Sequence, residues 1–191
     1  MVVAEKAVYE IRWHGRGGQG AVTSAKILAE AAYRSGFLGV TSQPSFGAER
    51  RGAPITASSR LAHEPIRVLS QVTNPDIVVV LDDSLLGVAN ATAGLAPDGM
   101  LIVNTALSAA ELDGVDGVAH VVTSDVSGAA QAADLIVAGQ PMVSTAILGA
   151  IAAATGLVTM ESVESAIRHA FSGTAADKNI EAARIAFGCT A

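Results

Sequence analysis

The feature that most constrains the fold is a glycine-rich segment, HGRGGQG at residues 14–20, which lies between two segments of different periodicity. Residues 8–13 (VYEIRW) alternate in character and are rich in β-branched and aromatic types, which predicts a strand. Residues 19–35 carry apolar side chains at helical spacing and are followed by Gly36, which predicts a helix. A strand, a glycine turn and a helix in this order are typical of an α/β domain that binds a phosphate group.

The glycines match the pattern G-x-G-x-x-G at Gly15, Gly17 and Gly20, with Gly18 as a fourth. Glycine allows the strand to turn sharply, the backbone to approach a ligand, and the helix to pack near the strand. The N–H groups of the first helical turn then face an anion, helped by the helix dipole. An alternative interpretation stays open, in which the glycines only permit close packing.

A dinucleotide cofactor is a further alternative, but the chain departs from its pattern. An NAD-binding fold carries Asp or Glu at the end of its second strand, where the acid contacts the ribose hydroxyls. Residues 39–45 read GVTSQPS at this place, with no acid before Glu49, and Arg16 adds a cation within the turn. A free-standing NAD(P)-dependent Rossmann oxidoreductase is therefore disfavoured and kept as the rival hypothesis.

A second loop, PSFGAERRGAP at residues 44–54, follows a predicted strand at 37–42. It places Arg50 and Arg51 between Gly47 and Gly52. Loops that follow parallel strands gather at one edge of a doubly wound sheet, so this loop is expected beside the first. Glycine-flanked arginines suit a phosphate or carboxylate clamp, and the alternative is a solvated arginine pair.

The rest of the chain alternates predicted strands with predicted helices. Ile77–Leu81 are five consecutive apolar residues, which indicates a strand buried on both faces of a parallel sheet. We expect further strands at 55–61 and 66–69 (paired as a hairpin), 100–103 and 118–122. Helices are expected at 84–95, after the strand at 118–122 and through residue 133, and at 141–154, 160–171 and 175–187. The sequence therefore predicts one domain, residues 1–191, with a Rossmann-like, doubly wound, mostly parallel sheet and a helical C-terminal part.

Composition narrows the class of protein further. Half of the residues are hydrophobic, only 16% are charged, and the mean hydropathy is +0.43, which indicates either surface buried against partner subunits or simply an alanine-rich chain. The net charge of −6 gives no support to a nucleic-acid or anionic-membrane surface. The single cysteine, Cys189, cannot form a disulfide, a zinc site or an iron–sulfur site within this chain. No segment is typical of a membrane span, so a cytoplasmic location is expected.

Two segments, HGRGGQGAVTSAKILAEAA (14–32) and SFGAERRG (45–52), resemble the gamma subunit or gamma domain of the 2-oxoacid:acceptor oxidoreductases. The pyruvate:ferredoxin oxidoreductase branch is the most similar, because the indolepyruvate branch tends to carry another residue at Arg16. The resemblance continues through NPDIVVVLDD (74–83), LIVNT (101–105) and STAILGAIAAATG (144–156), and so covers nearly the whole chain.

The resemblance implies a role within a larger enzyme. Members of the family decarboxylate a 2-oxoacid on thiamine diphosphate with Mg, pass electrons through iron–sulfur clusters to ferredoxin or NAD, and release an acyl-CoA. The thiamine diphosphate lies between alpha and beta subunits, and the clusters lie in a ferredoxin-like delta subunit. The gamma subunit packs over the active site and helps to bind coenzyme A, without being catalytic alone.

The family's site residues carry over onto two groups of positions in this sequence. They are Gly15, Arg16, Gly17, Gly18, Gln19 and Gly20 in the first loop, and Ser45, Phe46, Gly47, Glu49, Arg51 and Gly52 in the second. The resemblance implies that Arg16 and Arg51 meet phosphate groups of CoA and that Gln19 and Ser45 donate or accept hydrogen bonds. Ala53 stands where the family commonly has another glycine.

Other polar residues near predicted strand ends have plainer interpretations. His14 is expected to be a structural histidine at the strand end rather than an acid or base. Asp82 and Asp83 are expected to cap a helix or organise a loop. Asn104 and Thr105 either touch a ligand or partner, or cap the next segment.

Overall fold

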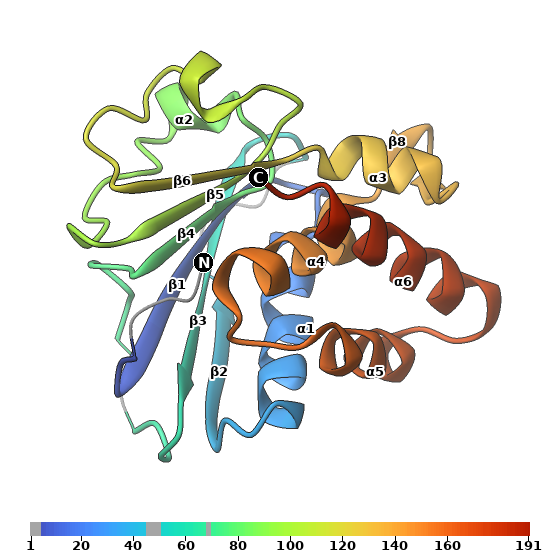
Figure 1. The fold of residues 1–191 in the computed structure, drawn as a ribbon, viewed down its shortest axis with the longest axis horizontal. Helices are drawn as coiled ribbons and strands as arrows, with labels where there is room; N and C mark the ends of the chain where they lie inside the picture. The colour runs from blue at the N-terminus through green and yellow to red at the C-terminus, as the bar shows by residue number, and fades with distance from the viewer. Residues whose placement is uncertain (1–4, 45–50, 68–69) are drawn as a thin grey trace.

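The computed structural model describes residues 5–44, 51–67 and 70–191. Its centre is a six-stranded sheet with strand order β2-β3-β1-β4-β5-β6 (Figure 1). The strands are β1 Val8–Arg16, β2 Gly39–Pro44, β3 Pro54–Ala62, β4 Ile77–Val80, β5 Met100–Asn104 and β6 His120–Ser124. Strands β1, β4, β5 and β6 pair in parallel, whereas β3 is antiparallel to both β1 and β2. The prediction of a mostly parallel α/β sheet is confirmed.

Helices lie on both faces of the sheet but are unevenly distributed. They are α1 Ala21–Arg34, α2 Leu85–Val88, η1 Ala109–Glu111, α3 Val126–Ala132, α4 Val143–Thr155, α5 Met160–Ala170 and α6 Gly173–Gly188. Figure 1 shows α1 and the C-terminal helices together on one side of the sheet, and α2 on the other. The predicted helical C-terminal part is therefore confirmed, and it packs against the first helix.

The central strands are buried on both faces. Ile77 and Val79 of β4 belong to the main hydrophobic core beneath α1 and α4, whereas Val78 and Val80 belong to a smaller core beneath α2. Every residue of β4 is fully buried, as the run of five apolar residues predicts. Trp13 of β1 is also fully buried, and its indole N–H donates a hydrogen bond to another strand. The partner is Ser59 Oγ of β3, at 3.0 Å.

The predicted hairpin between residues 55–61 and 66–69 is wrong. β3 pairs instead with β1 over its whole length and with β2 on its other side. Residues 64–67 form no strand, and 68–69 lie outside the described residues. The physical reason is burial, because pairing with β1 places Ala57 and Leu61 in the main core beside Trp13.

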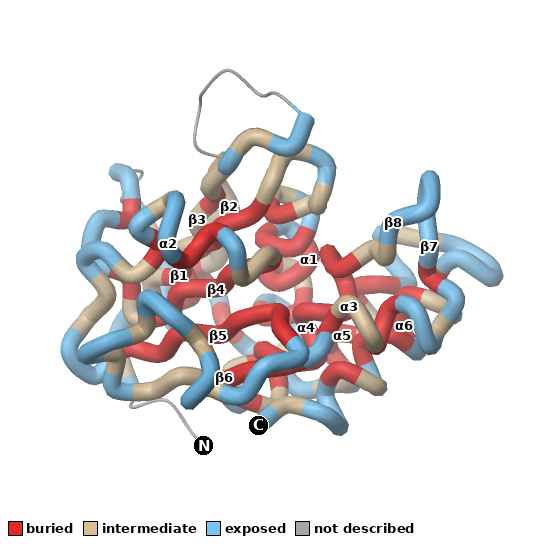
Figure 2. The backbone as a smooth tube through the Cα atoms, turned by 90° about the horizontal axis from the view of Figure 1, so that it is seen from above, coloured by how far each residue is buried: buried red, intermediate tan, exposed pale blue. Residues whose placement is uncertain are grey.

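Three smaller differences concern the edges of elements. β1 continues to Arg16, three residues beyond its predicted end, because its last residues pair with the start of β3. The helix expected at 84–95 is only the single turn α2, and Asn90 has a positive φ of 44°. A short hairpin of β7 (Ile136–Val137) and β8 (Gln140–Pro141) was not predicted, and Figure 2 shows it projecting as a largely exposed segment.

Among the helices of the described residues, none combines the length and the apolar character needed to cross a bilayer. The cytoplasmic location expected from the sequence stays a prediction.

Candidate functional site

The carboxyl ends of the parallel strands open into a pocket of about 660 Å³. Its walls are the glycine turn after β1, residues Arg51 and Gly52 before β3, the ends of β4 and β5, and the starts of α3 and α4. The tip of the β7–β8 hairpin completes the rim. Pockets in this range accommodate a cofactor-sized molecule, and this edge is where open α/β sheets bind their ligands.

The glycine turn requires glycine for two different reasons. Gly18 and Gly20 have φ of 99° and 84°, in a region that residues with a side chain rarely adopt. Gly15 and Gly20 are also confined by packing: a Cβ on Gly15 would lie 3.2 Å from Leu81 Cδ1, and one on Gly20 would lie 2.7 Å from Ser144 Cβ. The packing and backbone demands expected of the motif are therefore both present.

Helix α1 begins at this turn without a side chain that caps its first turn. Its N-cap is Gly20, which has no side chain to accept from the first backbone N–H groups. The N–H groups of a first helical turn have no partner within the helix, and together with the helix dipole they favour an anion. The start of α1 can thus hold a phosphate or carboxylate group.

The two predicted loops lie side by side and are joined through their backbones. The Gly17 N–H donates to the Ala53 carbonyl at 2.9 Å, and the Gly52 N–H donates to the Gly17 carbonyl at 3.0 Å. Gly17 and Arg51 form an isolated parallel bridge. The structure therefore brings Arg51 and Gly52 to the glycine turn, whereas the predicted site residues Ser45, Phe46 and Gly47, with Glu49 and Arg50, lie outside the described residues.

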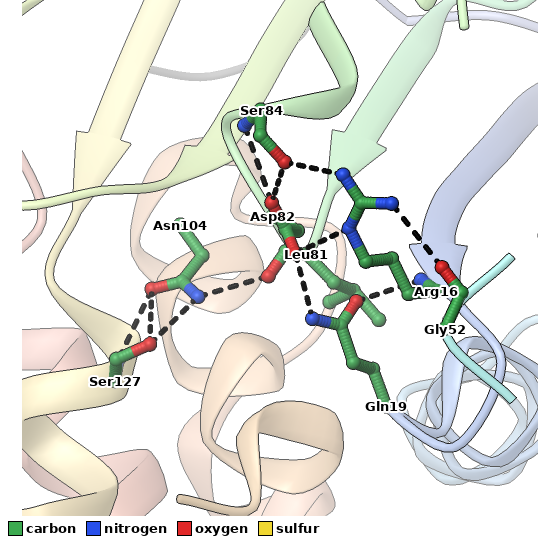
Figure 3. A network of polar contacts seen from close by, with 8 residues as sticks. All are labelled: Arg16, Gln19, Gly52, Leu81, Asp82, Ser84, Asn104 and Ser127. Atoms are coloured by element: carbon green, nitrogen blue, oxygen red, sulfur yellow. Dashed lines mark hydrogen bonds and ion pairs between the residues drawn. The ribbon is translucent and has the colours of Figure 1, made fainter. Parts of the chain in front are cut away.

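Arg16 is engaged by the protein itself (Figure 3). Its Nε lies 3.0 Å from Asp82 Oδ2, and its two terminal nitrogens donate to Ser84 Oγ at 2.7 Å and to the Gly52 carbonyl at 3.2 Å. One guanidinium group thereby connects the end of β1, the start of β3 and the segment after β4. Its expected contact with a phosphate stays a prediction, and its observed contacts hold three loops together.

Asp82 is the centre of this network. Its Oδ2 accepts from both Arg16 Nε and Gln19 Nε2, each at 3.0 Å, and its Oδ1 accepts from the Ser84 backbone at 3.2 Å and from the Ser84 hydroxyl. Burial raises the pKa of Asp82, but hydrogen bonds from Ser84 and Gln19 and the charge of Arg16 outweigh burial and lower it. Asp82 is ionised at neutral pH and organises the loop, as expected of it.

Gln19 uses both ends of its side-chain amide. Its Oε1 accepts from the Arg16 backbone N–H at 2.7 Å while its Nε2 donates to Asp82. The amide closes the glycine turn and ties it to the segment after β4. A carboxylate or a hydrocarbon of the same size would lose one or both of these hydrogen bonds.

Asn104 holds the start of α3, a helix after β6, rather than capping the segment that follows it, as one of its two expected roles had it. Its Nδ2 donates to the Leu81 carbonyl at 2.9 Å, and its Oδ1 accepts from the Ser127 backbone N–H at 3.0 Å in the first turn of α3. The neighbouring Thr105 donates its hydroxyl to Asp83 Oδ2 at 2.8 Å. Both residues also line the pocket. Because their polar groups already form hydrogen bonds within the protein, their main contribution is to shape the pocket wall.

His14 is a structural histidine. It is only 5% exposed, and its Nε2 accepts from Arg12 Nε at 3.1 Å. Burial, with the nearby positive charge of Arg12, lowers the pKa of His14 to about 4, so the ring is neutral at pH 7. His14 is also absent from the residues that line the pocket, so an acid or base role at this site is not supported.

The strand order of the sheet disfavours the alternative that the chain binds a dinucleotide. In a dinucleotide-binding fold, the second parallel strand supplies the residue that reads the ribose. Here the antiparallel β3 lies between β1 and β2, and β2 ends in Ser42, Gln43 and Pro44 without an acid. Across the described ranges, no three His, Cys, Asp or Glu side chains are grouped as metal ligands.

Sequence reasoning missed the part of the pocket that comes from the C-terminal half. Val137, Ala138 and Gln140 of the β7–β8 hairpin line it, together with Met142 and Val143 at the start of α4. Ala138 and Gly139 at the tip of this hairpin both have a positive φ, of 51° and 76°. In the sequence they appear only as the dipeptide AG, which is a weaker turn signature than NG or DG.

Comparison with known proteins gives consistent results. Residues 10–189 match the family described as pyruvate ferredoxin/flavodoxin oxidoreductase. The pyruvate/ketoisovalerate oxidoreductases common subunit gamma of Pyrococcus abyssi is 52% identical over 178 residues, which cover 93% of this chain and 95% of that relative.

Two solved structures are similar in fold. The pyruvate oxidoreductase subunit PORC of Thermotoga maritima has a TM-score of 0.83 and 35% identity, covering 97% of this chain and 98% of that one. The 2-oxoglutarate:ferredoxin oxidoreductase of Magnetococcus marinus, solved with 2-oxoglutarate, coenzyme A and succinyl-CoA, has a TM-score of 0.75 and 18% identity. The likeness covers 97% of this chain but 31% of that larger chain, and at this identity it is a likeness of fold alone.

Proposed function

Because the chain belongs to the pyruvate ferredoxin/flavodoxin oxidoreductase family, as a gamma subunit of a multi-subunit enzyme, we propose that it helps to bind coenzyme A over that enzyme's active site. The pocket at the strand ends is the place of binding in this proposal. In this proposal the chain is not catalytic alone and acts when assembled with its partners.

The partners in this proposal are an alpha, a beta and a ferredoxin-like delta subunit. Thiamine diphosphate with Mg²⁺, between alpha and beta, supplies the decarboxylation chemistry, and iron–sulfur clusters on the partners pass the electrons to ferredoxin or NAD. The contribution of this chain is to present CoA, so that its thiol accepts the acyl group and the products are an acyl-CoA and CO₂.

The observation that carries the proposal is the combination of an uncapped helix start with a cationic loop held beside it. The start of α1 offers backbone N–H groups, and Arg51 lies on the same pocket wall, joined to Gly17 through the backbone. The diphosphate and the 3′-phosphate of CoA are the anionic groups that such a wall favours. The pocket volume of about 660 Å³ lies in the range of pockets that bind cofactor-sized molecules.

The choice of 2-oxoacid is proposed to lie with the other subunits. The Pyrococcus abyssi relative is described as common to pyruvate and ketoisovalerate oxidoreductases, so one gamma subunit there serves two oxoacids. We therefore expect pyruvate, a branched-chain oxoacid or an aromatic one such as phenylglyoxylate to be selected elsewhere in the complex.

The proposal is tested by placing a charge in the glycine turn of the purified complex. No atom of the described residues lies within 4 Å of a Cβ added to Gly18, so Gly18→Asp and Gly18→Asn introduce side chains of one size that differ in charge. Both variants carry the same backbone strain at a φ of 99°. A difference between the two variants therefore reports the added charge and not the strain. We expect the KM for CoA to be roughly tenfold higher in Gly18→Asp than in Gly18→Asn, from charge repulsion of about 1.4 kcal/mol.

The KM for the 2-oxoacid is expected to be equal in the two variants, since the oxoacid does not use this pocket. Equal KM values for CoA in Gly18→Asp and Gly18→Asn would contradict binding of CoA at this turn. Tight binding of NAD(H) by a complex whose activity needs no CoA would favour the rival NAD(P)-dependent function.

A further inference from the structure

We propose that the two arginines of the site have different tasks: Arg51 contacts a phosphate group of CoA, and Arg16 is a positioning residue that holds the Arg51 loop against the glycine turn. This division rests on the proposed function. It assigns the ligand contact to one of two residues that the sequence pattern treats as equivalent.

The contacts of Arg16 are those of a structural clamp. Three of its guanidinium N–H groups are used, towards Asp82, Ser84 and the Gly52 carbonyl. Its positive charge is matched by the Asp82 carboxylate at 3.0 Å, and the side chains of this ion pair are 31% and 22% exposed. An Arg16 that turned fully towards a phosphate would leave Asp82 without its cation beside the incoming anion, so the observed contacts favour the positioning task for Arg16.

The Arg51 side chain is free for a ligand. It is exposed, it lines the pocket, and within the described part of the chain it makes no ion pair. Its backbone, in contrast, is held in place, because Arg51 bridges to Gly17 and the next two residues, Gly52 and Ala53, form backbone hydrogen bonds with Gly17. A fixed backbone with an unpaired guanidinium group is the arrangement that recognises phosphate at low entropic cost.

The acidic residues of the pocket restrict where a phosphate group can bind. Asp83 and Asp125 also line the pocket, and they belong to the segments after β4 and β6. Asp83 accepts from Thr105, and Asp125 caps α3 by accepting from the Gly128 N–H. Since Arg16 neutralises Asp82, Arg51 is the described cation of the pocket that has no anionic partner, so a phosphate is drawn towards Arg51 and away from Asp83 and Asp125.

The first arm of the test removes the Arg51 charge in the assembled enzyme. Arg51→Gln is expected to raise the KM for CoA roughly tenfold, with a much smaller change in kcat, and Arg51→Lys to recover most of the loss. The matched control is Arg168→Gln on α5, an exposed arginine far from the pocket walls, for which no change in the KM for CoA is expected. Co-purification of each variant with the partner subunits checks assembly.

The second arm separates positioning by Arg16 from direct binding of the phosphate. Arg16→Gln alone leaves Asp82 unpaired, so it is expected to lower the melting temperature and to raise the KM for CoA. Adding Asp82→Asn removes the unpaired charge and lets the two amides hydrogen-bond to each other, and this double variant is expected to recover most of the affinity for CoA. If Arg16 instead bound a phosphate group directly, Asp82→Asn would not restore that interaction, and the affinity would stay low.

Two results would overturn the division of tasks. One is an unchanged KM for CoA in Arg51→Gln, and the other is a double variant as weak in CoA binding as Arg16→Gln alone. Either result leaves the proposed function standing if Gly18→Asp still weakens CoA relative to Gly18→Asn. If that pair also shows no difference, the CoA site itself is misplaced.

Discussion

Gly20 and Ser144 lie so close together that a Cβ added to Gly20 would be 2.7 Å from the Cβ of Ser144. The close approach marks the place where the start of α1 crosses the start of α4, and Ser24 reinforces it by donating its hydroxyl to the Ser144 carbonyl at 2.7 Å. The glycine turn is thus held from behind by a helix that is more than one hundred residues later in the sequence.

Gly20→Ala is expected to destabilise the chain by about 2–4 kcal/mol, because a methyl group overpacks the helix crossing and a side chain is strained at a φ of 84°. Urea unfolding of the purified chain measures the loss. Gly117→Ala is the matched control, since Gly117 has a φ of 77° but no described atom within 4 Å of its added Cβ. Equal losses in the two variants would show that the packing against Ser144 contributes nothing.

Helices α4 and α6 approach each other at Gly149. A Cβ on Gly149 would lie 1.8 Å from the Ala183 carbonyl oxygen, which belongs to a backbone that cannot move aside cheaply. Gly149→Ala is expected to cost about 3 kcal/mol or to prevent folding, despite the better helix propensity of alanine. Gly188→Ala in α6 meets no described atom within 4 Å and is expected to be neutral in the same melting experiment.

The sequence was sufficient to predict elements whose signal is local. Five apolar residues predicted the doubly buried β4, and helical spacing followed by Gly36 predicted α1 within two residues of its observed bounds. The glycine turn and its neighbour loop were placed on the same edge because the carboxyl ends of parallel strands must meet there. The backbone hydrogen bonds of Gly17 show that this inference was correct for the described part of the second loop.

Contacts between distant segments could not be predicted in the same way. β3 pairs with β1 because this pairing buries Leu61 and Ala57 in the main core. The periodicity of a single segment predicts a strand, but it does not predict which other strand will bury its side chains best. The engagement of Arg16 by Asp82 joins residues 66 positions apart, so a motif that shows only a cation near a glycine turn cannot distinguish a ligand contact from a clamp. The β7–β8 hairpin lacks a strong turn signature and was missed.

Gln19→Glu is expected to destabilise the turn at neutral pH. The substitution replaces the Nε2 donor, 3.0 Å from Asp82 Oδ2, by an acceptor oxygen with a negative charge. Two carboxylates at this separation repel each other, and a loss of about 1–3 kcal/mol is expected. The repulsion raises the pKa of the introduced carboxyl above its unfolded value, so the loss is expected to shrink as the pH falls towards 5.

The control for this variant is Gln140→Glu, which adds the same charge to the rim of the same pocket at an exposed residue. Thermal melting at pH 7.5 and pH 5 compares the two. A loss in Gln19→Glu that matches the control, or that does not depend on pH, would show that the amide is not needed to bridge the turn and Asp82.

Because His14 is buried and neutral, we expect the folded chain to lose stability in mild acid. Burial and the charge of Arg12 lower its folded-state pKa to about 4, below the ordinary value of 6.5. Between these two values the unfolded chain binds a proton that the folded chain does not, so stability is complete above pH 6.5 and falls as the pH drops towards 4. The full contribution is about 3 kcal/mol, and below pH 4 this group adds no further loss.

His14→Gln is the variant that isolates this effect, because its side-chain oxygen can still accept from Arg12 but cannot be protonated. Urea midpoints measured from pH 7.5 to pH 4.5 are expected to fall less steeply for the variant than for the parent chain. Asp82 does not confuse the comparison: its folded-state pKa is lowered below 3.8, so its contribution is lost only in stronger acid. Parallel pH profiles for the two chains would mean that His14 is protonated in the folded state, and its assignment as a neutral structural residue would then fail.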